Sequence, residues 1–106
     1  MARTIRWTRL VADDLEQAVE YIARDSPAYA RAFARKVVDA GQSLAEFSER
    51  GAIVEELGDP SVRQLFIGSY RLVYLVAPEM VVLLGLIHAR RNFGAAWKSE
   101  ERMPPR

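Results

Sequence analysis

Hydrophobic and polar residues follow two different periods along this chain, and the change of period separates its first elements. Ile5 and Trp7 alternate with polar neighbours, which predicts a short strand with one buried face. From Val11 onward the apolar residues recur at helical spacing, with acidic residues on the other side. This pattern predicts a helix that ends near Arg24.

A second helix is expected after a very short connection. Ser26 is suited to cap the free N–H groups at a helix start, and Pro27 fits the first helical position. The apolar stripe then continues to about Phe47, although Gly41 costs the helix roughly 1 kcal/mol relative to alanine. Because the connection is so short, the two helices are predicted to form an antiparallel hairpin.

The C-terminal half returns to strand-like patterns. Three runs of apolar and β-branched residues, 62–67, 70–76 and 80–88, are separated by short turns. Strands joined by such turns form an antiparallel meander. The order of one strand, two helices and three strands predicts an α+β fold, in which the helical hairpin packs on a small antiparallel sheet.

The last two strands are apolar on both faces, whereas a helical hairpin covers only one face of a sheet. Val73, Leu75, Val82 and Leu84 belong to the face that the hairpin leaves free. An apolar surface of this size needs a second layer. It is supplied either by the C-terminal tail or by a partner chain, which is another copy of this chain or a different protein, and the sequence leaves the two alternatives open.

The length of the chain predicts a single domain. We assign residues 1–98 to one domain and residues 99–106 to a flexible tail. A short helix is expected near Trp97. No apolar run is long enough to cross a bilayer, and the N-terminus lacks the apolar core of a signal peptide. We therefore expect a cytoplasmic protein without a membrane partner.

Composition excludes several kinds of chemistry. The chain has no cysteine and one histidine, so disulfides, thiolate catalysis and cysteine-bound zinc are excluded, and neither a metal nor a cofactor is expected. Residues 9–56 hold ten acidic and six basic residues, a net charge of −4. Residues 60–98 hold five basic residues and one acidic residue, a net charge of +4. This basic half is either an anion-binding surface or a set of arginines that pair with the acidic half.

Three positions in the basic half are candidates for chemistry. Arg71 projects from an apolar strand, where a guanidinium needs an anion or an exit to water. His88 ends the last strand beside Arg90 and Arg91, and a histidine is suited to proton transfer near neutral pH. Trp97 is expected to cap the sheet rather than to stack on a base.

Three stretches of the chain carry a family resemblance. They are the helical pair over 12–33 with Ser26-Pro27, the strands over 62–74 with Tyr70-Arg71-Leu72-Val73-Tyr74, and residues 87–91 with the basic end Arg90-Arg91. Together they resemble the RelE/ParE superfamily of bacterial toxins from type II toxin–antitoxin pairs, over residues 4–91. The resemblance implies a cognate antitoxin as partner and a toxin–antitoxin hetero-oligomer. It also implies that the antitoxin covers Val73, Leu75, Val82 and Leu84, which the free protein would expose.

The superfamily divides into two branches with different targets. RelE-like members cut mRNA on the ribosome, and this branch would make Arg71, His88 and Arg91 the catalytic candidates. ParE-like members bind DNA gyrase and trap its cleavage complex without being nucleases. In both branches the residues proposed to bind the target are Arg63, Arg71, Arg90, Arg91 and Trp97.

The details of the sequence favour the ParE-like branch. The lysines of RelE proper would fall near Val62 and Gln64, so both are missing here, and a phosphoryl-transfer site without them loses charge stabilisation. Ser26-Pro27 at the start of the second helix also resembles the ParE branch. A gyrase inhibitor is therefore the preferred function. The first alternative is a ribosome-dependent mRNA endonuclease, and the second alternative is a non-toxic binding module. Whether the protein is an enzyme depends on the branch.

Overall fold

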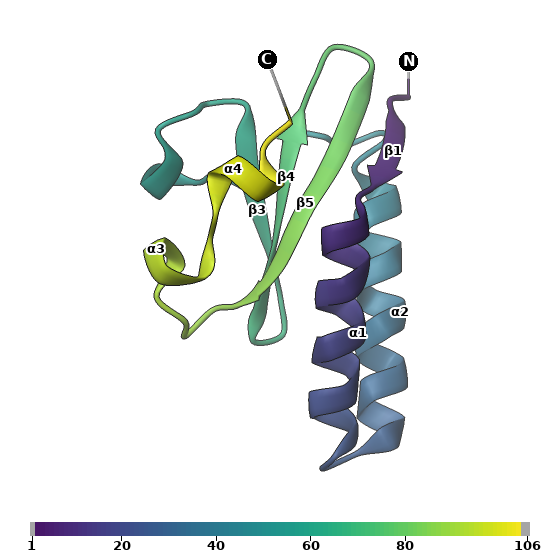
Figure 1. Ribbon diagram of the computed structural model, residues 1–106. Coiled ribbons are helices and arrows are strands. Elements are labelled where there is room, and N and C mark those ends of the chain that lie inside the picture. The colour runs from purple at the N-terminus through teal and green to yellow at the C-terminus, as the bar shows by residue number, and fades with distance from the viewer. Residues whose placement is uncertain (1, 105–106) are drawn as a thin grey trace.

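A five-stranded sheet with a helical hairpin on one face organises residues 2–104, the part of the chain that the computed structural model describes (Figure 1). The strands are β1 (Thr4–Trp7), β2 (Ala52–Ile53), β3 (Val62–Ile67), β4 (Tyr70–Val76) and β5 (Met80–His88). The helices are α1 (Arg9–Ala23), α2 (Pro27–Ser43), the 3-10 helix η1 (Glu55–Leu57), α3 (Phe93–Ala96) and α4 (Ser99–Arg102). The predicted α+β fold is confirmed.

The strands lie in the order β1-β5-β4-β3-β2. The predicted meander is present, since β3, β4 and β5 pair antiparallel. The prediction of a purely antiparallel sheet is wrong at one edge, where β1 pairs parallel to β5. Parallel neighbours need a long crossover connection, and here the helical hairpin lies within it.

Side-chain caps decide where the two long helices begin. Thr8 caps α1 by accepting a hydrogen bond from the Val11 N–H at 3.2 Å, so this helix starts two residues before the predicted position. Ser26 caps α2 as predicted, because its hydroxyl accepts from the Tyr29 N–H at 3.1 Å. The helix α2 ends at Ser43, before the predicted end near Phe47, and turns follow it.

The hairpin packs on the first face of the sheet around a core of large buried side chains. Members of this core are Val11, Phe33, Val37, Leu44, Leu72, Tyr74, Val81 and Leu83. Gly41 permits close approach of α2 to β1, because a Cβ atom on it would lie 2.8 Å from Cζ2 of Trp7. The close packing of α2 on the sheet thus offsets the low helix propensity of glycine at this position.

The C-terminal segment covers the second face of the sheet, on the side opposite to α1 and α2 (Figure 1). Phe93 and Trp97 pack there on Val73, Leu75, Val82 and Leu84, whose exposed fractions are between 0% and 8%. The expectation that the free protein exposes these four side chains is therefore wrong. Of the two alternatives for the second layer, the chain's own C-terminus is the one that the structure shows.

An ion pair holds the last described helix, α4, against α1. Arg102 donates from Nη1 to Oδ2 of Asp14 at 2.7 Å and from Nη2 to Oδ1 at 3.1 Å. Gly85 lies beneath this contact, since a Cβ atom on it would be 2.7 Å from Nη1 of Arg102 and 2.9 Å from Cζ3 of Trp97. A domain over residues 1–98 with a flexible tail over residues 99–106 stays a prediction, and within that tail Arg102 pairs with α1 and Met103 packs on the second face of the sheet. Residues 105–106 lie outside the described residues.

Candidate functional site

The turn between β3 and β4 brings the end of β5 next to the helical hairpin. Gly68 occupies the first turn position with a φ of 58°, and Ser69 has no positive φ, the pattern of a type II′ hairpin turn. The turn places Tyr70 opposite His88 in the sheet register. Their rings meet edge to face with 5.0 Å between centroids.

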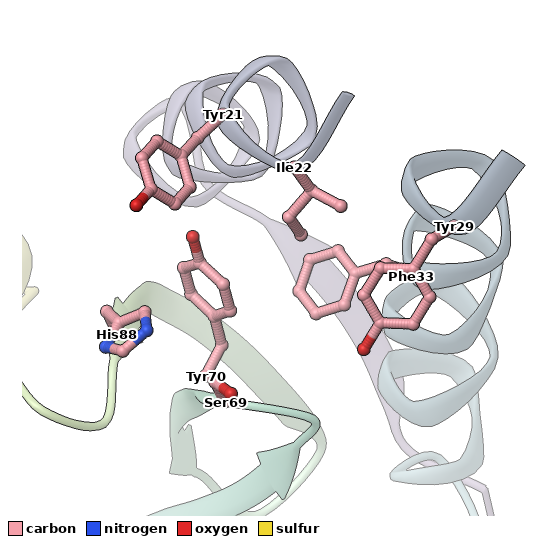
Figure 2. A pocket seen from close by; sticks show the side chains of 7 residues that line it. All are labelled: Tyr21, Ile22, Tyr29, Phe33, Ser69, Tyr70 and His88. Atoms are coloured by element: carbon pink, nitrogen blue, oxygen red, sulfur yellow. The ribbon is translucent and has the colours of Figure 1, made fainter. Parts of the chain in front are cut away.

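An apolar hollow of about 130 Å³ opens between this strand end and the tips of α1 and α2 (Figure 2). Its lining residues are Tyr21, Ile22, Tyr29, Phe33, Ser69, Tyr70 and His88. Phe33 contacts Tyr70 with ring centroids 5.1 Å apart. Tyr21 and Tyr29 stay 61% and 51% exposed, so aromatic surface borders the hollow without being covered.

Polar groups form the rim of the hollow on the side of α1. The hydroxyls of Tyr21 and Tyr70 point toward one another (Figure 2). Burial raises the pKa of Tyr70, and Tyr21 raises it further, so this hydroxyl stays protonated at neutral pH. Nδ1 of His88 accepts a hydrogen bond from the Arg90 N–H at 3.1 Å, which leaves Nε2 as the ring nitrogen free for another partner. Arg91 lines an adjoining hollow together with Tyr21, Tyr70 and His88.

Arg71 lies on the opposite face of the sheet and is 8% exposed. It donates from Nη1 to Oε1 of Gln64 at 2.7 Å and from Nη2 to Oε2 of Glu56 at 3.4 Å. The ring of Phe93 covers the guanidinium at 4.5 Å from its centroid. Its Nε atom is buried without a hydrogen-bond partner among the described residues. An anion that binds Arg71 would therefore have to displace these groups.

Two other candidate residues make structural contacts, Arg63 at the loop before β2 and Trp97 beside the Phe93 ring that covers Arg71. Arg63 donates from Nη1 to the Gly51 carbonyl at 2.7 Å and lies 4.0 Å from the Glu49 carboxylate, so it holds the loop before β2. Trp97 is 6% exposed and stacks on Phe93 with centroids 5.2 Å apart. The expectation that Trp97 caps the sheet is confirmed.

Two absences complete the description of residues 2–104. No group of three or more His, Cys, Asp or Glu side chains in this range could hold a metal ion. Within the same range, no helix is long and apolar enough to cross a membrane.

Residues 5–93 match the family model described as the ParE toxin of type II toxin–antitoxin systems, parDE. The chain belongs to this family. Its sequence is 34% identical over 92 residues to Toxin RelE2 of Caulobacter vibrioides, an alignment that covers 86% of this chain and 99% of that toxin.

Two solved structures share the fold of this toxin. One comes from the chromosomal ParDE toxin–antitoxin system of P. aeruginosa, with a TM-score of 0.69, 21% identity, and 84% of this chain and 98% of the other covered. The second is from the RelBE2 toxin–antitoxin complex of Mycobacterium tuberculosis, with a TM-score of 0.58, 25% identity, and coverage of 83% and 99%. The protein is thus a type II toxin of the ParE/RelE family.

In this toxin the three catalytic candidates do not form one site. His88 and Arg91 line hollows on the helix side, whereas Arg71 is on the side of the C-terminal segment. Sequence reasoning also missed the two exposed tyrosines, Tyr21 and Tyr29. Both fall outside the apolar stripes of their helices, and a large aromatic residue on the polar side of a helix was the available signal.

Proposed function

We propose that this toxin inhibits bacterial growth by acting on DNA gyrase in the cytoplasm, and that a cognate antitoxin protein neutralises it. The ParE-like branch of the superfamily has this target, and the matching family is described as the ParE toxin. The antitoxin partner is supported by the two similar structures, which come from a ParDE toxin–antitoxin system and a RelBE2 toxin–antitoxin complex.

The position of Arg71 is the observation that carries the choice of target. A nuclease of the RelE type needs basic groups that meet around one phosphate, where they stabilise charge in the transition state. Both Nη atoms of Arg71 already have partners, and His88 lies on the opposite face of the sheet. This separation argues against a preformed nuclease site and supports a protein that acts by binding.

Ribosome-dependent mRNA cleavage is the second candidate. One specific observation favours it, namely the 34% identity to a protein named Toxin RelE2. In that case the Phe93 segment would have to leave the sheet, so that Arg71 could contact RNA phosphate.

Precursor incorporation separates the candidates. The toxin is induced in bacteria without an antitoxin, and labelled thymidine and labelled methionine are followed side by side within minutes. An early fall in thymidine incorporation is expected, with methionine incorporation falling later. A supercoiling assay with purified gyrase and the purified toxin then tests direct action on the enzyme.

Other outcomes contradict the proposal in distinguishable ways. An immediate fall in methionine incorporation with DNA synthesis spared would replace gyrase inhibition by mRNA cleavage. Continued growth and unchanged incorporation of both precursors would indicate a non-toxic binding module. An early fall in thymidine incorporation without inhibition of purified gyrase would point to another component of DNA replication.

A further inference from the structure

The apolar surface that this toxin leaves uncovered is different from the surface that the sequence pattern indicated. The C-terminal segment already covers one face of the sheet, and α1 and α2 cover the other. Among the described residues, six large hydrophobic side chains remain exposed: Tyr21, Tyr29, Val38, Phe47, Ile53 and Phe66. Two of the six, Tyr21 and Tyr29, border the same hollow, which makes that hollow a candidate contact surface.

The hollow has the size and lining of a receptor for a side chain. Its volume of about 130 Å³ is below the roughly 300–1,000 Å³ of a small-molecule pocket. Ile22 and Phe33 contribute apolar side chains to it (Figure 2). Two exposed tyrosine rings flank these side chains, and tyrosine is enriched where proteins bind other proteins because it adds both area and a hydroxyl.

Donors without partners lie beside this apolar lining. The hydroxyls of Tyr21 and Tyr70 and the guanidinium of Arg91 make no hydrogen bond or ion pair with another described residue. Asp14 is the acidic residue that lines a further hollow bordered by Arg91, and it is already paired with Arg102. The charge of Arg91 is therefore available to an anionic group from outside.

We propose that this hollow is a docking site for the antitoxin, and that it receives an apolar side chain whose neighbouring carboxylate pairs with Arg91. The inference rests on the proposed toxin–antitoxin function and adds the place and chemistry of the contact. The apolar lining, the tyrosine hydroxyls at the rim and the unpaired cation complement an acidic segment with an aliphatic or aromatic anchor. The hollow takes the place of Val73, Leu75, Val82 and Leu84 as the proposed antitoxin contact surface, because the C-terminal segment already buries these four side chains.

The test measures the dissociation constant between the full-length toxin and its antitoxin. The antitoxin used is the protein that restores growth when it is expressed together with this toxin. Tyr21→Ala and Arg91→Ala are each expected to raise Kd by about tenfold or more, since they remove an anchor contact and a charge partner. Higher NaCl concentration is expected to weaken wild-type binding more than binding by Arg91→Ala.

Two matched controls use exposed residues outside the hollow. Phe47→Ala removes an aromatic side chain that is 65% exposed, and Arg35→Ala removes an exposed arginine from α2. Each is expected to change Kd by less than about threefold. A charge reversal adds specificity: Arg91→Glu should bind poorly, and exchanging one antitoxin carboxylate for lysine should restore its affinity. Melting temperatures of all variants check that they fold.

Several results would overturn the assignment. One is a Kd unchanged in both Tyr21→Ala and Arg91→Ala, and another is an equal loss in the two controls. A loss of gyrase inhibition with unchanged antitoxin affinity would assign the hollow to the target instead. The proposed function fails separately, through the precursor assay on the wild type or through the absence of any protein that protects cells.

Discussion

The ion pair between Arg102 and Asp14 is predicted to hold the C-terminal segment on the sheet. Arg102→Ala removes two hydrogen bonds to Asp14 and a third, at 3.0 Å, to the Leu84 carbonyl. Asp14 would keep its bond from the Leu86 N–H at 2.9 Å but would lose its cation. The substitution thus leaves the Asp14 carboxylate without its cation and removes the Arg102 donor from the Leu84 carbonyl of β5.

The magnitude follows from the burial of the pair. Breaking a fully buried ion pair costs about 3–5 kcal/mol. The side chains of Arg102 and Asp14 are 13% and 15% exposed, so water reaches the broken pair and the expected loss is about 2–3 kcal/mol. For a domain of 106 residues, that loss corresponds to a fall in melting temperature of roughly 9–14 °C.

Urea unfolding followed by circular dichroism measures the loss of stability. A Trp7→Phe background leaves Trp97 as the one tryptophan of the chain, and its ring lies 5.3 Å from the Arg102 guanidinium. Its fluorescence in the native state therefore reports whether the segment stays docked. Glu101→Ala is the matched control on α4, because Glu101 is exposed. It should change the free energy of unfolding by less than about 0.5 kcal/mol.

The result that would refute this reasoning is a loss below about 0.5 kcal/mol in Arg102→Ala with unchanged Trp97 emission. The segment would then be held by the packing of Phe93 and Trp97 alone. Arg102→Lys separates charge from geometry, since lysine keeps the charge but lacks the planar pair of donors. It is expected to recover part, not all, of the lost stability.

Substitutions at three further positions test the packing and the titration of the core. Gly41→Ala is expected to destabilise the folded protein by about 1–3 kcal/mol, because the new Cβ atom would collide with Trp7. This cost exceeds the gain from the better helix propensity of alanine. A raised melting temperature in thermal unfolding would contradict this expectation. Arg71→Ala should lower the free energy of unfolding by about 2–3 kcal/mol. Arg71→Met should lower it by less than about 1.5 kcal/mol, because methionine refills the space under Phe93. Equal losses in the two variants would contradict the packing argument. Burial raises the pKa of Tyr74 above 10.0, so the folded chain keeps a proton that the unfolded chain loses, and stability should fall as pH rises above 10.0. Urea titrations from pH 7 to 11 should show a smaller fall in Tyr74→Phe, at a cost of about 1–3 kcal/mol for the lost acceptor of the Gly51 N–H.

Local patterns were sufficient to predict the elements of this toxin. The start of α2 at Ser26 and Pro27 depends on two neighbouring residues and their hydrogen bonds, so the sequence carries it. The meander of β3, β4 and β5 follows from apolar runs joined by turns that allow antiparallel pairing alone. The family resemblance was carried by the same short segments and is confirmed over residues 5–93.

The candidate site was predicted less well, because its residues meet through packing between distant parts of the chain. His88 and Arg91 were named from their place at the end of a strand, and they do line neighbouring hollows. Tyr21 reaches the same place from α1, and no spacing rule connects a helix residue with a strand end that far along the chain. Such contacts are decided by how the hairpin lies on the sheet.

The sequence by itself determined the α+β fold class, the order of the elements and the family, since each depends on local periodicity or on short segments. The tertiary structure alone decided on which face of the sheet each strand side chain lies and which segment covers that face. Arg71 and His88 are both in the basic half of the chain, yet the strand register sends them to opposite faces. The C-terminal segment hides one apolar face, and the hollow around Tyr21 and Tyr70 stays open. Long-range packing brings these residues together or keeps them apart, and hydrophobic patterning along the chain does not encode that arrangement.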